Sequence, residues 1–136
     1  MTASYLPLWE SLRSEQFDPL ALWQRVGEDT QLLCELVRIF TAEYPEIIRR
    51  IEQALQVRDA AQLQKASHLL KGSLLQLSAF GAAGAAAELE DSASRSRLES
   101  SSQLIEKVKI EIDCLMQMLK TMTSSIQKSS SFESGG

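Results

Sequence analysis

The single histidine of the chain, His68, lies among residues that could support chemistry at its ring. A helical projection of the surrounding segment places His68 about 140° from Leu63, on the side opposite an apolar stripe. Lys65 and Lys71 each lie one helical turn from the histidine. A neutral imidazole can act as a nucleophile through a ring nitrogen, and nearby ammonium groups would stabilise negative charge on an incoming group. The apolar stripe consists of Leu63, Ala66, Leu70, Leu74 and Leu77.

Gly72 follows His68 by one turn and leaves no side chain beside the ring. A glycine inside a helix costs about 1 kcal/mol relative to alanine, so we interpret this one as giving a partner access to the imidazole. Leu69 and Leu75 also point away from the apolar stripe, and Gln64 and Lys65 lie on the same outer side. We therefore expect these four side chains to belong to a docking surface around His68.

Other interpretations of the histidine are less consistent with the sequence. A lone histidine on a helix surface usually has no function, and only its combination with Lys71 and Gly72 favours one. A metal site is disfavoured because there is no second histidine and neither Cys34 nor Cys114 is at ligand spacing. A di-iron bundle would require a Glu-x-x-His pair, which the sequence lacks.

The elements that must position these residues are predicted to be helices, in an all-α fold. The 136 residues suffice for one compact domain, and 6 glycines and 3 prolines are too few for many tight turns. Apolar residues recur at intervals of three and four, which predicts an antiparallel four-helix bundle with one or two short additional N-terminal helices. The long helices are expected at Asp29 to Leu55, Ala60 to Leu77, Ala82 to Ser96, and from Ser100–Ser102 to Ile126.

Local signals indicate where several of these helices begin and end. Asp29 and Asp59 are predicted N-caps, and a short helix is expected from Asp18 to Val26, closed by Gly27. Pro45 lies within the first long segment, for which we favour one kinked helix over two helices that meet end to end. The domain limits expected are an N-terminal extension over 1–17, the bundle over 18–126 and a disordered tail over 127–136.

Charge and composition restrict the class of partner and the compartment. Fourteen basic against 18 acidic residues give a net charge of −4, the wrong sign for binding nucleic acid. No stretch approaches the roughly 18 apolar residues of a membrane span, and the start of the chain lacks the features of a signal peptide. The two separated cysteines are typical of reduced thiols. We expect a cytoplasmic monomer that binds neither nucleic acid nor membrane.

The segment Ala-Ser-His-Leu-Leu-Lys-Gly-Ser at 66–73 resembles the His-x-Leu-Lys-Gly-Ser signature of histidine-containing phosphotransfer (HPt) domains. Leu89-Glu90 falls where such domains have Leu-Glu or Leu-Gln, and Phe40 resembles their second-helix phenylalanine. The resemblance covers roughly Phe17 to Met122. Two positions depart from it: Ser78-Ala79 replaces the usual Gly-Ala, so that this turn could be longer or differently capped, and Leu75 replaces a small residue.

The resemblance implies a phosphorelay protein. His68 would accept a phosphoryl group from a receiver-domain aspartate and pass it to another receiver domain, with Lys71 stabilising its charge and Gly72 giving access. Glu90 would orient the histidine or be an ordinary exposed acid. The receiver would hold the Mg²⁺, so the chain would need no cofactor of its own, and a hybrid sensor histidine kinase is an expected partner.

Two further expectations follow. The sequence has no GxxxxGK[ST] loop and no glycine-rich nucleotide lid, so we expect no ATP-dependent kinase activity of its own. The resemblance implies a phosphocarrier with a phosphohistidine intermediate rather than an enzyme. The alternative is a non-phosphorylated helical adaptor that binds a regulator or kinase through the His68 face.

Overall fold

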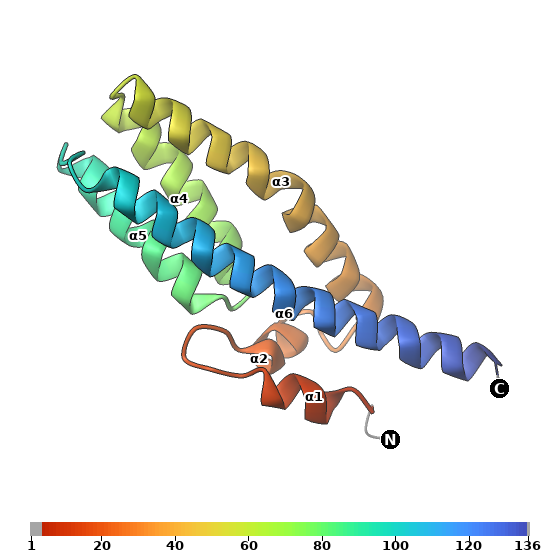
Figure 1. Ribbon diagram of the computed structural model, residues 1–136. Coiled ribbons are helices and arrows are strands. Elements are labelled where there is room, and N and C mark those ends of the chain that lie inside the picture. The colour runs from red at the N-terminus through yellow and green to blue at the C-terminus, as the bar shows by residue number, and fades with distance from the viewer. Residues whose placement is uncertain (1–3, 136) are drawn as a thin grey trace.

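The computed structural model describes residues 4–135, with side chains as far as residue 128. Within the described residues there are six helices and no strand, which confirms the all-α prediction (Figure 1). Their bounds are α1 Leu6–Ser11, α2 Pro19–Arg25, α3 Thr30–Gln56, α4 Ala60–Gln76, α5 Phe80–Ser94 and α6 Ser101–Gly135.

Aspartates begin three of the helices. Asp18, Asp29 and Asp59 have extended backbones, and each carboxylate accepts a hydrogen bond from the backbone N–H three residues later. Each of these bonds satisfies one of the N–H groups that have no partner within the helix. The predicted starts of α2, α3 and α4 are therefore confirmed.

The turns between the bundle helices share one geometry, in which an ordinary residue adopts the left-handed conformation. Arg58, Ser78 and Ser96 have φ of 56°, 56° and 53°. After each of them a backbone N–H bonds back to the last turn of the preceding helix, as Ala79 does to the Leu74 carbonyl at 3.0 Å. This is the Schellman arrangement, which ends a helix and reverses the chain within a few residues.

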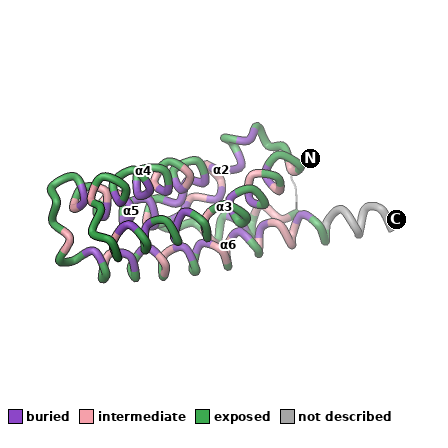
Figure 2. Tube along the Cα trace, turned by 90° about the horizontal axis from the view of Figure 1, so that it is seen from above, coloured by how far each residue is buried: buried purple, intermediate pink, exposed green. Residues whose placement is uncertain are grey.

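The four long helices pack in sequence order into an antiparallel bundle. α4 lies between α3 and α5, and α6 packs against both α5 and α3. Buried positions recur along the inward side of each helix (Figure 2). Small residues on α5 allow its neighbours to approach closely. The buried alanines of α5 are Ala82, Ala83, Ala85, Ala86 and Ala93. α3 runs unbroken through the exposed Pro45, which confirms a single helix at that position.

The N-terminal segment packs into the same core as the bundle. Trp9 and Phe17 are buried, and the Trp9 indole Nε1 donates a hydrogen bond to Ser125 Oγ of α6 at 2.9 Å. Two backbone bonds attach the loop before α2 to the α4–α5 turn: Asp18 N–H to Ser78 O and Gly81 N–H to Gln16 O. The part of the predicted 1–17 extension that the structure describes therefore contacts the bundle closely.

The last helix is longer than expected. The helical backbone of α6 continues to Gly135, whereas a disordered tail is predicted over 127–136. No glycine or proline interrupts the sequence between Ser101 and Ser134, so nothing in the backbone chemistry ends the helix earlier. α6 consequently extends past the end of the bundle (Figure 1). In the described part of the chain, no helix is long and apolar enough to cross a membrane.

Candidate functional site

His68 lies in the middle of α4 with its side chain 68% exposed. Ser67, directly before it, and Leu70, two residues after it, are buried, so the phase of α4 turns the imidazole outward. On α5, Leu89 is fully buried and fixes the position of the adjacent Glu90. The Nδ1 atom of His68 lies 2.8 Å from Oε1 of Glu90. The packing of α4 against α5 thus pairs the two side chains.

Glu90 also contacts the lysine one turn after the histidine. Its Oε2 atom lies 2.8 Å from Nζ of Lys71, and both side chains are largely covered. The Lys71 ammonium, and then the His68 ring, lower the pKa of Glu90, although partial burial of the carboxyl group acts in the opposite direction. Glu90 is therefore a carboxylate that bridges His68 and Lys71, which favours an orienting contact over an ordinary exposed acid.

The hydrogen bond restricts which ring nitrogen of His68 can react. An ionised carboxylate can only accept hydrogen bonds, so Nδ1 is the protonated nitrogen in this pair. In the neutral ring the lone pair is then on Nε2. In this arrangement Nε2 is the ring nitrogen that could act as a nucleophile, while Glu90 contacts Nδ1 through one oxygen and the Lys71 ammonium through the other.

The space next to the imidazole is open at Gly72. A Cβ atom built at this position meets no other atom within 4 Å, so the helix does not require glycine for packing. Leu69 and Leu75 are 49% and 41% exposed. Gln64 is also exposed. The structure thus places the predicted docking residues on the outer surface of α4.

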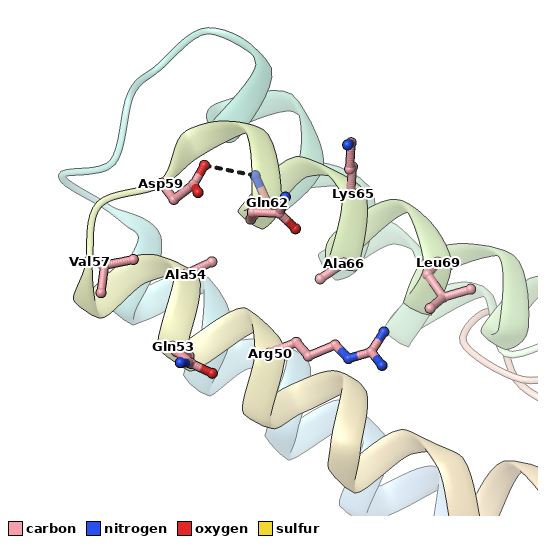
Figure 3. A pocket seen from close by; sticks show the side chains of 9 residues that line it. All are labelled: Arg50, Gln53, Ala54, Val57, Asp59, Gln62, Lys65, Ala66 and Leu69. Carbon is pink, nitrogen blue, oxygen red and sulfur yellow. Dashed lines mark hydrogen bonds between the residues drawn. The ribbon is translucent and has the colours of Figure 1, made fainter.

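Lys65 differs from Lys71 in its surroundings. It is exposed and lines a groove between α3 and α4 together with Leu69 and Arg50 (Figure 3). It therefore lies apart from the Glu90 cluster, which consists of His68, Lys71 and Glu90. Arg50 is not among the residues predicted from the sequence to line the docking surface. Periodicity shows which positions of one helix share a face, but it does not show which residue of another helix lies opposite them.

A family model described as "Hpt domain" matches residues 35–124 of the chain. The chain belongs to the HPt domain family. The matched range includes His68, Lys71 and Glu90. The Hpt domain is a helical bundle, in agreement with the fold of this chain. No curated protein and no solved structure matches the chain.

Membership of the HPt family establishes the general function. HPt domains act in histidine phosphotransfer within two-component signalling, as phosphocarriers rather than enzymes, and their partners are receiver domains and kinases of phosphorelays. The resemblance inferred from the residues around His68 is therefore confirmed, as is the helical-bundle fold.

The HPt domain accommodates both departures from the family pattern. Ser78 adopts the left-handed conformation that glycine usually supplies, and α4 ends at Gln76 with the same hydrogen bonds as the other turns. Leu75 adds an exposed apolar side chain three residues after Gly72. The first departure thus leaves the bundle unchanged, whereas the second changes the surface that a partner meets.

Proposed function

We propose that His68 is the phosphoacceptor, and that it receives its phosphoryl group from a receiver-domain aspartate and passes it to a second receiver domain. The observation that carries this proposal is the contact of Glu90 with both His68 Nδ1 and Lys71 Nζ, each at 2.8 Å. It leaves Nε2 as the reactive nitrogen on an exposed ring.

The transfer begins with attack of the Nε2 lone pair on the phosphorus of the partner's aspartyl phosphate. A P–N bond forms, the P–O bond to the aspartate breaks, and the aspartate leaves as a carboxylate. The ring keeps its proton on Nδ1 and is cationic at that point, so the Glu90 carboxylate stabilises it electrostatically. Transfer to the second receiver reverses these steps.

Lys71 has a second role in this proposal. Its ammonium group contacts Glu90 in the unphosphorylated protein. The flexible side chain can turn toward the phosphoryl oxygens when they arrive, where its charge stabilises the transferred group. The divalent cation belongs to the receiver, and the chain supplies no cofactor. We place this protein in the cytoplasm as a monomer, consistent with its two free cysteines.

Incubation with radiolabelled, phosphorylated receiver domains tests the proposal. Wild-type protein should gain acid-labile, base-stable label, and His68→Gln should gain none while keeping its helical circular dichroism spectrum. Glu90→Gln should transfer roughly tenfold more slowly, the effect of losing one charge-assisted hydrogen bond of about 1.5 kcal/mol. Label on His68→Gln would contradict the assignment. Tight receiver binding without any label on the wild type would favour the adaptor.

A further inference from the structure

An open groove runs between the C-terminal half of α3 and the N-terminal half of α4, with a volume of about 440 Å³ (Figure 3). Ala54 and Ala66 are the buried residues in its lining, and Leu69 and Val57 add exposed apolar side chains, 49% and 66% exposed. Leu69 directly follows His68, so the groove begins beside the proposed phosphoacceptor.

Positive charge lies on both sides of this apolar lining. The Arg50 side chain, 60% exposed, extends from α3 toward Leu69 of α4 (Figure 3). Lys65 stands on the α4 rim with its ammonium group pointing away from Arg50. Within a chain of net charge −4, Arg50 therefore places a positive charge at the groove, and Lys65 adds a second positive charge on its rim.

Asp59 lines the groove and Glu46 contacts Arg50, and both carboxylates have other partners. Asp59 accepts the backbone N–H of Gln62 as the N-cap of α4. Glu46 lies 2.7 Å from Arg49 and 3.7 Å from Arg50, so its shorter contact is with the arginine outside the groove. The guanidinium of Arg50 consequently keeps N–H donors available, in the planar arrangement that matches a carboxylate.

We propose that this groove receives an acidic side chain, flanked by apolar residues, of the receiver domain that docks on His68, and that Arg50 binds its carboxylate. The inference rests on the proposed function. A partner whose aspartyl phosphate reaches His68 must also cover Leu69, and a stable interface of roughly 800 Å² per partner extends well beyond one helical turn. The groove offers such an extension, with apolar lining for contact and cations for charge complementarity.

Charge reversal at Arg50 tests the proposal. The probe is the phosphorylatable receiver domain, from the organism that encodes the chain, that binds the wild-type protein most tightly in titration calorimetry. Arg50→Glu should weaken its binding at least about tenfold, with a smaller loss for Arg50→Gln and Lys65→Glu. Wild-type affinity should also fall more steeply with salt than that of Arg50→Gln.

Arg38→Glu is the matched control. Arg38 is 68% exposed and pairs with a glutamate of the same helix, as Arg50 does, but it lies about 18 Å away along α3 and about 120° around its axis. Its reversal should leave receiver binding unchanged. Phosphorylation of His68 by the small donor phosphoramidate should be equal in wild type, in both Arg50 variants and in Arg38→Glu, because that donor does not use the groove.

The outcomes separate this proposal from the proposed function. If Arg50→Glu binds the receiver as tightly as wild type, or if Arg38→Glu loses as much receiver affinity as Arg50→Glu, the groove is not a receiver site, even if His68 is labelled. Binding that depends on Arg50 without any label on His68 would support the groove and contradict the phosphoacceptor. Replacing the matching receiver carboxylate with arginine should restore binding to Arg50→Glu.

Discussion

At the scale of single residues, Glu90 contacts both the His68 ring and the Lys71 ammonium group. Its pKa is lowered, mainly by the Lys71 ammonium, from an ordinary value of 4.5. Because the folded-state pKa lies below the unfolded-state value, the charged carboxylate stabilises the fold fully above pH 4.5, and this contribution is lost as the pH falls through the folded-state pKa.

A comparison with Glu90→Gln measures this contribution. Near neutral pH the variant should be less stable by no more than about 1 kcal/mol, as expected for a contact at the surface. The difference in the free energy of unfolding should shrink toward zero below the folded-state pKa, where Glu90 is itself neutral. Urea denaturation over a series of pH values would show this. A difference that stays constant into strong acid would mean that the glutamate acts through packing.

Gly72 is expected to serve access rather than packing, because a Cβ atom there meets open space. Gly72→Ala should raise the free energy of unfolding by up to about 1 kcal/mol. Gly72→Gln should keep wild-type thermal stability and yet slow transfer from a receiver domain by orders of magnitude. Uptake from phosphoramidate would fall much less. A variant that unfolds would instead show that the glycine is needed by the helix.

The residues of the candidate site that lie on α4 can be predicted from the sequence, whereas the groove between α3 and α4 cannot. His68, Lys71 and Gly72 belong to one helix, so spacing alone relates them. Glu90 is on another helix, so the sequence leaves both interpretations of it open, and only the packing of α5 on α4 shows that it lies 2.8 Å from His68. Arg50 gives no local signal, because its position opposite Leu69 depends on how α3 packs against α4.

At the scale of elements, the turn between α4 and α5 shows what a residue pattern can and cannot predict. The break after Leu77 is predicted correctly, but α5 begins at Phe80 rather than Ala82 and includes Gly81. A Cβ atom at Gly81 would lie 2.7 Å from Cγ of Gln16. This glycine allows the loop before α2 to approach closely, a requirement that only the tertiary structure reveals.

Ser78 closes this turn at some cost to stability. It has φ of 56°, and its buried hydroxyl has no hydrogen-bond partner in the structure. Ser78→Gly should relieve the left-handed strain of about 1–2 kcal/mol, offset in part by the greater freedom of glycine in the unfolded chain. We expect the free energy of unfolding, measured by thermal denaturation, to rise by about 0.5–1 kcal/mol.

Ser96→Gly is the control for the backbone effect. Ser96 has a similar φ of 53° at an exposed turn. Its replacement should give the conformational gain without removing a buried hydroxyl. A loss of stability in Ser78→Gly alone would show that the Ser78 side chain contributes packing that outweighs its strain.

At the scale of the whole molecule, the N-terminal segment completes the end of the bundle. The sequence shows no periodic pattern over 1–17, because a helix as short as α1 depends on tertiary contacts for its stability. Trp9 stacks on Tyr5 with ring centroids 4.4 Å apart and meets Trp23 of α2 edge to face at 5.2 Å. These aromatic contacts, and the bond from Trp9 to Ser125, attach α1 to both α2 and α6.

Trp9→Ala should therefore destabilise the whole domain, by about 3–5 kcal/mol in urea denaturation followed by far-ultraviolet circular dichroism. Leu8→Ala, at a position of the same short helix that is 43% exposed, should cost less than about 1 kcal/mol. If both substitutions lower the free energy of unfolding by equally small amounts, α1 contributes little to the core. Because Glu90, the hydrogen-bond partner of His68, lies on α5 and its second partner Lys71 lies on α4, the folded fraction of Trp9→Ala should still take up phosphate at the wild-type rate. This result would separate the stability of the bundle from the chemistry on its surface.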